Sequence, residues 1–238
     1  MNRSSQLAIA VPAYFAPGNG WNRLAGRGGA AALAVVNPNS GPGAAVEPAY
    51  AQAIRRAQAH GVRVFGYVHT SYGARPQAAV LAEAEGYRDW YAVDGIFFDE
   101  ARSDRAGQPY YAALRRALKA RDSALLIALN PGTRPDERYM DVAEVVVTFE
   151  GDFASYLREP TPPAWMQRLA PSRFWQIVYG VPDAAALQQV LASAGEGHAG
   201  YIYITDGTLP NPYGALPSYW TEERRAVAAT PSLAWPHP

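Results

Sequence analysis

The chain has 238 residues, of which 49% are hydrophobic and 18% are charged. This composition can bury a large core and excludes disorder as the main state. Because 21 basic residues balance 21 acidic ones, no overall charge attracts nucleic acid, and no apolar run reaches the ~20 residues that span a bilayer. The sequence has no cysteine and one lysine, Lys119, which excludes thiol chemistry and argues against Schiff-base chemistry. Any catalysis must rest mainly on carboxylates.

The first residues contain one arginine and a short apolar run that Pro12 interrupts. This run is shorter than the apolar core of a signal peptide, so we expect Leu7–Val11 to open a first strand. The chain as written predicts a cytoplasmic location. A leader ahead of these residues would instead indicate secretion.

Short apolar runs alternate with alanine-rich stretches along the whole chain. Most of the apolar runs are continuous, as in strands that are buried on both faces. The expected strands are Leu7–Phe15, Ala32–Asn37, Arg63–His69, Gly95–Asp99, Ala124–Asn130, Val145–Glu150, Phe174–Gly180 and Gly200–Thr205. The expected helices are Pro48–His60, Gln77–Tyr91, Pro109–Arg121, Ala184–Ala194 and Thr221–Ala229.

Eight strand–helix repeats in a chain of this length predict a single α/β domain, a (β/α)8 TIM-type barrel over residues 1–229. A doubly wound sheet is the competing fold, but the sequence has no glycine-rich nucleotide-binding turn after the first strand. The helical signal is weaker after strands one, five and six. Residues 26–32 resemble a loop, and three prolines interrupt Ser155–Leu169. The Pro-rich tail, residues 230–238, is expected to be a surface extension.

Acidic residues follow three even-numbered strands. In such barrels the chemistry lies at the C-terminal ends of the strands, where the sequence has Asp99, Glu100, Glu150 and Asp206. Alternate strands contribute to one layer of the lumen, so Asp99 and Glu150 could face each other, as a glycosidase pair requires. Side chains alternate along a strand, so the polar Thr148 favours a lumenal Glu150. Asp206 and Glu100 could equally be helix N-caps.

Two further acidic residues, Asp94 and Glu144, precede their strands and are assigned to the structural end of the barrel. Aromatic and amide side chains also gather at the predicted rim, where they could stack on sugars and hydrogen-bond their hydroxyls. At least half of the aromatic residues are expected to pack in the core, and His69 could be purely structural. The candidate substrate-binding residues are Tyr14, Asn37, Asn39, His69, Tyr72, Asn130, Tyr179, Tyr203 and Asp206.

Five motifs resemble the spherulin-4-like family, glycoside hydrolase family 135, in matching order: NPNSGPG at 37–43, GYVHTSYGAR at 66–75, GIFFDE at 95–100, NPGT at 130–133 and VTFEG at 147–151. The resemblance implies a (β/α)8 barrel that cleaves α-1,4-linked N-acetylgalactosamine in exopolysaccharides such as galactosaminogalactan. It places the essential acidic positions at Asp99, Glu100 and Glu150. Asp99 would be the nucleophile and Glu150 the acid/base. Members of the family are commonly secreted or membrane-anchored.

These inferences together predict an endo-acting, retaining glycosidase in which Glu100 orients Asp99. The expected partner is a polysaccharide or oligosaccharide, bound by a monomer that needs no cofactor and no metal. Two alternatives remain open. One is a carbohydrate-binding barrel that does not hydrolyse its ligand, and the other is a metal-dependent lyase or hydrolase that uses Asp99 and Glu100.

Overall fold

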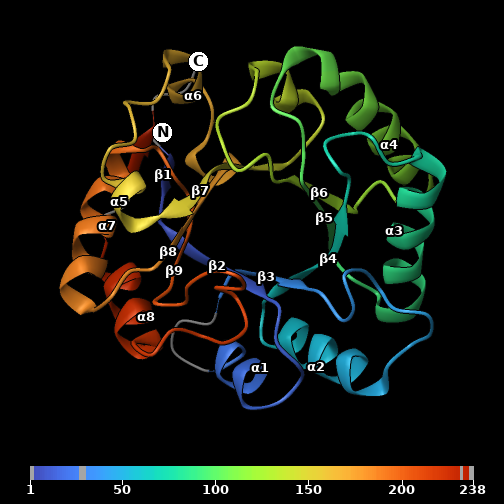
Figure 1. Ribbon diagram of the computed structural model, residues 1–238, viewed down its shortest axis with the longest axis horizontal. Coiled ribbons are helices and arrows are strands. Elements are labelled where there is room, and N and C mark those ends of the chain that lie inside the picture. The colour runs from blue at the N-terminus through green and yellow to red at the C-terminus, as the bar shows by residue number, and fades with distance from the viewer. Residues whose placement is uncertain (1–2, 27–30, 231–232, 236–238) are drawn as a thin grey trace.

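The computed structural model describes residues 3–26, 31–230 and 233–235, and its centre is a closed barrel of eight parallel strands (Figure 1). Each strand pairs with the next, and β9 pairs with β2 to close the barrel. This architecture confirms the predicted TIM-type barrel. The strands are β2 (Ala8–Ala13), β3 (Leu33–Val36), β4 (Arg63–His69), β5 (Gly95–Asp99), β6 (Leu126–Leu129), β7 (Val145–Asp152), β8 (Phe174–Tyr179) and β9 (Tyr201–Ile204).

Helices of unequal length surround the barrel (Figure 1). All five of the predicted helices are present, with bounds within a residue or two of those expected. The α-helices are α1 (Asn19–Leu24), α2 (Pro48–Ala59), α3 (Gln77–Tyr91), α4 (Gln108–Arg121), α5 (Phe153–Tyr156), α6 (Ala164–Gln167), α7 (Ala184–Glu196) and α8 (Trp220–Ala229). Short 3-10 turns occur at η1 (Arg105–Gly107), η2 (Glu137–Asp141) and η3 (Pro171–Arg173).

The helical layer is thinnest after β6 and β7, where the sequence signal was weakest. Only η2 follows β6, while α5 and α6 have four residues each. Pro160, Pro162 and Pro163 lie between α5 and α6, and proline cannot continue a helix because it lacks the N–H and its ring clashes with the preceding turn. Most of the loop expected at residues 26–32 lies outside the described residues.

The core has one layer inside the barrel and one between the strands and the helices. Inside, the rings of Phe97 and Trp175 meet edge to face with centroids 5.5 Å apart. Outside, α3 packs closely on β4 because Gly66 has no side chain. A Cβ atom at Gly66 would lie 2.3 Å from Cγ of Tyr87, closer than any real contact. Burial on both faces explains why the strands appear in the sequence as continuous apolar runs.

A small second sheet joins the two ends of the described chain. The strand β1 (Arg3–Ser5) pairs antiparallel with β10 (Leu233–Trp235). Part of the tail that we expected to be a surface extension is therefore hydrogen-bonded to the N-terminal segment. Among the described residues, no helix is long and apolar enough to cross a membrane.

Candidate active site

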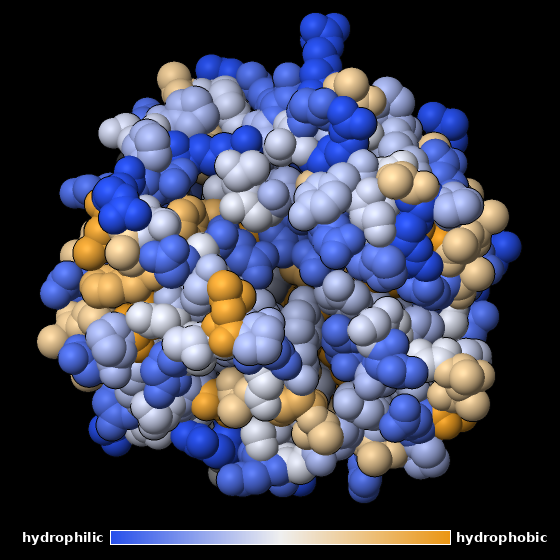
Figure 2. All heavy atoms as spheres, in the orientation of Figure 1, coloured by the Kyte–Doolittle hydropathy of each residue, from blue (hydrophilic) through white to orange (hydrophobic). Residues whose placement is uncertain are grey.

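A cavity of about 510 Å³ opens at the C-terminal ends of the strands. In the orientation of Figure 1, the molecular surface is hollowed near the barrel axis and bordered mainly by hydrophilic residues (Figure 2). A volume of this size suits a small-molecule or sugar-sized ligand. The cavity is lined by Tyr14, Asn37, Pro38, Asn39, Ser40, Tyr67, Glu150, Tyr179, Leu209, Pro210, Asn211, Pro212 and Tyr213.

A β-bulge in β7 determines where Glu150 points. Val147 is in register with Trp175 of β8, but the next pair along the ladder is Phe149 with Gln176, so Thr148 is an extra residue without a partner. The lumenal Trp175 places Val147 on the inner face, and plain alternation from Val147 would turn Glu150 outward. The bulge shifts the alternation by one residue and brings Glu150 into the lumen. The predicted orientation of Glu150 is therefore observed, but simple alternation from Thr148 was the wrong reason for it.

Asp99 and Glu150 share one amide group, that of Asn130 at the end of β6. Nδ2 of Asn130 donates to Oδ1 of Asp99 at 2.8 Å and to Oε2 of Glu150 at 2.5 Å. The separation of these two carboxylate oxygens cannot exceed the sum of the two lengths. Oδ1 of Asn130 accepts from the backbone N–H of Gly132 at 2.9 Å, which fixes the amide with its NH₂ group toward the two carboxylates.

Each carboxylate has further donors of its own. The hydroxyl of Tyr213 donates to Oε1 of Glu150 at 2.5 Å. The carboxylate of Asp99 accepts from the hydroxyl of Tyr67 and from the backbone N–H of Glu100. Asp99 remains partly exposed although it is not among the residues that line the cavity. The two acidic groups thus lie side by side in a small, fully hydrogen-bonded cluster.

Burial and mutual repulsion determine how this cluster holds protons. Desolvation, followed by the charge of Glu150, raises the pKa of Asp99 to about 6, although its hydrogen bonds act in the opposite direction. Burial and the same carboxylates raise the pKa values of Tyr14, Tyr67 and Tyr213 above their ordinary value. The phenols therefore stay protonated at neutral pH. The carboxylates of Asp99 and Glu150 lie close enough to share a single proton.

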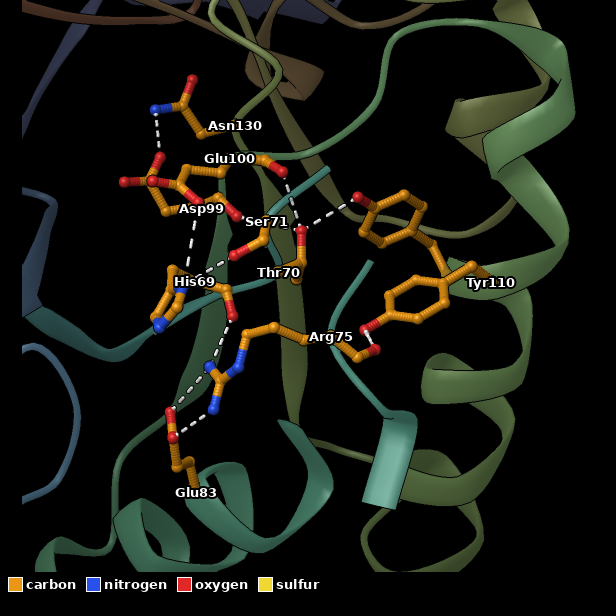
Figure 3. A network of polar contacts seen from close by, with 10 residues as sticks. His69, Thr70, Ser71, Arg75, Glu83, Asp99, Glu100, Tyr110 and Asn130 are labelled. Atoms are coloured by element: carbon orange, nitrogen blue, oxygen red, sulfur yellow. Dashed lines mark hydrogen bonds and ion pairs between the residues drawn. The ribbon is translucent and has the colours of Figure 1, made fainter. Parts of the chain in front are cut away.

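Glu100 follows Asp99 at the end of β5 and lies near His69 and Thr70 (Figure 3). Its backbone is left-handed, with φ at 49°, so its N–H reaches back to Asp99 while its side chain turns to the rim. There, one carboxylate oxygen lies 3.6 Å from Nδ1 of His69. The buried hydroxyl of Thr70 lies 2.8 Å from the backbone oxygen of Glu100 and 3.1 Å from that of Asp99. Glu100 therefore contacts Asp99 through the backbone.

The structure brings some of the candidate substrate-binding residues to the cavity and leaves others away from it. Four of them line the cavity with Glu150: Tyr14, Asn37, Asn39 and Tyr179. His69 and Tyr72 lie outside the lining on the neighbouring rim, where the side chain of Tyr72 is 62% exposed. Tyr203 is fully buried behind Tyr213.

Two of the candidates, Asp206 and Asn130, bond other groups of the protein instead of lining the cavity. Asp206 accepts from the backbone N–H of Ser218 at 3.2 Å and does not line the cavity. It is not a helix N-cap either, because Tyr219 takes that position in α8. Asn130 is 5% exposed and its NH₂ group is occupied by the two carboxylates, so it orients acidic groups and is not available to a ligand. The sequence placed Tyr67 and Tyr213 among the aromatic residues near the predicted rim that could stack on a sugar, but it did not indicate their hydrogen bonds to Asp99 and Glu150. The described residues contain no group of three or more His, Cys, Asp or Glu arranged to hold a metal ion.

Comparison with known proteins adds the family. Residues 8–227 match the model of spherulation-specific family 4. Spherulin-4 of Physarum polycephalum is 31% identical, and the match covers 95% of this chain and 71% of that protein. Among solved structures, Sph3 of Aspergillus clavatus in complex with GalNAc superposes with a TM-score of 0.79 at 23% identity, covering 94% of this chain and 98% of Sph3.

A more distant likeness is the glycoside hydrolase domain of PelA from Pseudomonas aeruginosa. Its TM-score is 0.53 at 12% identity, and 84% of this chain and 96% of that domain are covered. At such identities these structures establish a shared fold. The family match and the spherulin-4 identity go further, and by both measures this chain belongs to the spherulin-4 family.

Proposed function

We propose that this protein is a retaining, endo-acting glycoside hydrolase that cleaves α-1,4-linked N-acetylgalactosamine in exopolysaccharides such as galactosaminogalactan. The observation that carries the proposal is the Asn130 amide shared by Asp99 and Glu150. Bonds of 2.8 and 2.5 Å to one nitrogen keep the facing oxygens within the ~5–5.5 Å typical of retaining enzymes, whereas inverting enzymes need ~6.5–9.5 Å for a water molecule.

In the first half-reaction, a carboxylate oxygen of Asp99 attacks the anomeric carbon while Glu150 gives its proton to the glycosidic oxygen. The bond to the leaving sugar breaks, and a glycosyl ester forms on Asp99. In the second half-reaction, Glu150 takes a proton from water, and the resulting hydroxide attacks the anomeric carbon and releases Asp99. The Glu100 N–H donates to Asp99, a bond that favours the ionised nucleophile and opposes the burial that raises its pKa.

The choice of sugar is supported by the walls of the cavity. Tyr14, Tyr67, Tyr179 and Tyr213 offer aromatic faces and hydroxyls, and such rings stack on sugars while their polar tips bond hydroxyl groups. Asn37 and Asn39 follow β3, which lies between the strands that precede Tyr14 and contain Tyr67, and they can bond hydroxyl or acetamido groups. The similar Sph3 structure contains GalNAc, which supports the same monosaccharide here.

The proposed reaction requires that the carboxyl groups of Asp99 and Glu150 together hold one proton. Because the pKa of Asp99 is raised to about 6 by burial and by the charge of Glu150, the pair loses its last proton near that pH. We therefore expect kcat/KM to fall as pH rises above about 6, tenfold per pH unit.

The test is digestion of a panel of amino-sugar polymers, with released oligosaccharides analysed by mass spectrometry and the first-formed anomer by proton NMR. The proposal predicts N-acetylgalactosamine oligomers with retained configuration. Prolonged binding of a polymer without any product would indicate a carbohydrate-binding barrel, and an inverted first product would overturn the nucleophilic role of Asp99.

A further inference from the structure

The two side-chain donors that bond Glu150 differ in one respect that bears on proton transfer. Glu150 accepts from the amide of Asn130 on Oε2 and from the hydroxyl of Tyr213 on Oε1. An amide N–H can only donate, but a hydroxyl can both donate and accept. When Glu150 gains a proton on Oε1, the hydroxyl of Tyr213 can rotate and accept a hydrogen bond from that protonated oxygen without any movement of the ring.

Tyr213 is held firmly for such a role. Its ring is 7% exposed and meets the ring of Tyr14 edge to face, with centroids 5.7 Å apart. Its backbone N–H bonds the side chain of Asn211 at 3.1 Å. Burial, the charge of Glu150 and the hydrogen bond to it all raise the pKa of Tyr213, so the phenol keeps its proton throughout the working pH range.

The segment that carries Tyr213 is itself tightly built. It connects β9 to α8, and its two ends are joined because Asp206 accepts from the N–H of Ser218. Within it, Gly207 touches the backbone of Pro212 so closely that a Cβ atom would lie 2.2 Å from the Pro212 oxygen. These contacts fix the hydroxyl of Tyr213 against Glu150.

We propose that Tyr213 is the positioning residue that lets Glu150 exchange its proton without leaving its place. The hydroxyl accepts from Oε1 while Glu150 is protonated. When that proton passes to the glycosidic oxygen, the hydroxyl turns and donates to the carboxylate that remains. When Glu150 takes a proton from water, the hydroxyl turns back. The inference rests on the proposed acid/base function of Glu150, and Tyr213 itself forms no covalent bond.

The variant Tyr213→Phe removes the hydroxyl and leaves the ring. Its matched control is Tyr219→Phe, which removes a buried hydroxyl from the same segment. That hydroxyl donates to the backbone oxygen of Val181 at 2.8 Å and not to Asp99 or Glu150. Because a hydrogen bond to a charged group is lost, we expect kcat/KM of Tyr213→Phe to fall roughly 10- to 100-fold on a substrate with a poor leaving group.

Two further readouts separate positioning from general damage. The loss of kcat/KM in Tyr213→Phe should be smaller on aryl glycosides whose leaving groups need no proton. The alkaline limb of the pH–rate profile should also move to higher pH, because the doubly ionised Asp99–Glu150 pair loses the Tyr213 hydroxyl as a hydrogen-bond donor. The control should behave like the wild type in both. Equal losses on all leaving groups, with an unmoved pH profile, would overturn the proposal.

A titration followed by carboxyl ¹³C NMR keeps this inference distinct from the proposed function. The last proton should leave the Asp99–Glu150 pair at higher pH in Tyr213→Phe than in the wild type or in Tyr219→Phe. If the wild type cleaves no substrate, the proposed function fails while this titration still decides whether Tyr213 controls the proton of the pair. An unchanged titration would refute the role of Tyr213 even in an active enzyme.

Discussion

Acidic residues occupy both ends of the barrel, but their partners differ. At the N-terminal ends of the strands, Asp94 accepts from the backbone N–H of Val64 at 2.7 Å. On the same side, Glu144 accepts from the N–H of Ile127 at 2.8 Å and pairs with Arg115 at 2.7 Å. At the C-terminal ends, Asp99 and Glu150 share a single amide, and no cation among the described residues hydrogen-bonds either of them.

This difference changes how the acidic groups hold protons. Burial acts to raise the pKa of Glu144, but its bonds to Arg115, to the Ile127 N–H and to Lys119 prevail, and the pKa is lowered. At Asp99, burial and the charge of Glu150 prevail over the hydrogen bonds, and the pKa is raised to about 6. Glu144 is therefore held in its ionised form by its partners, whereas Asp99 keeps its proton to higher pH than an ordinary aspartate does.

The largest expected effect separates the two ends by paired substitutions. Glu150→Gln should lower kcat by roughly 10²- to 10⁴-fold, because the general acid is lost, with little change in melting temperature. Glu144→Gln should leave kcat near the wild-type value but reduce the free energy of unfolding by about 1–3 kcal/mol, since it weakens bonds to a backbone N–H and two cations.

The measurements are steady-state kinetics and denaturant unfolding on the same preparations. Loss of activity in Glu144→Gln without loss of stability would mean that the two ends are not functionally distinct. So would full activity in Glu150→Gln.

The next effect concerns the segment that carries Tyr213. Gly207→Ala places a Cβ atom 2.2 Å from the backbone oxygen of Pro212, so the segment must shift and displace the hydroxyl from Glu150. We expect kcat/KM to fall on the order of 10²-fold, because small misplacements at an active site are costly. Gly214→Ala is the control, because the nearest atom to its Cβ would be in the side chain of Asn211 at 3.4 Å, with the backbone oxygen of Asn211 at 3.9 Å. Equal activity of the two variants would contradict the close approach at Gly207.

A smaller effect should appear in the dependence of stability on pH. The pKa of Asp99 rises from 3.8 to about 6 on folding, so its contribution is complete below pH 3.8 and is lost as pH rises through 6. Unfolding of the wild type at pH 4 and pH 7.5 should therefore reveal a loss, relative to Asp99→Asn, of about 2 kcal/mol. A difference between the two proteins that stays constant over this range would show that Asp99 is not perturbed.

The smallest effect tests an acidic residue outside both ends. Glu223 of α8 is fully buried, burial raises its pKa well above the ordinary value, and its Oε1 accepts from the N–H of Ile204 at 3.0 Å. Glu223→Gln keeps this acceptor and should retain stability at pH 7. Glu223→Ala leaves the N–H unpaired and should cost about 1–3 kcal/mol. Similar melting temperatures for the two variants would mean that this hydrogen bond contributes little.

The sequence was sufficient to predict the barrel, because strands buried on both faces are continuous apolar runs and the stretches between them show the spacing of apolar residues that is typical of helices. It also placed Asp99 and Glu150 at strand ends. The bulge at Thr148 was not predictable, since nothing in the residues of β7 distinguishes an extra residue from plain alternation. Tyr213 lies 63 residues from Glu150 in sequence, on an irregular segment whose path depends on tertiary contacts. For the same reason Asp206 was expected near a ligand and instead bonds Ser218. Tyr203 belongs to β9 but is covered by Tyr213, a tertiary contact that the sequence of the strand does not indicate.

The central claim is that Asp99 and Glu150 act together on one glycosidic bond, with Asp99 as the nucleophile. Intact-protein mass spectrometry after incubation with a slowly hydrolysed N-acetylgalactosaminyl fluoride tests this directly. We predict one covalent glycosyl adduct in the wild type, mapped by peptide digestion to Asp99 and absent from Asp99→Asn. An adduct on another residue, or one that still forms in Asp99→Asn, would contradict the assignment.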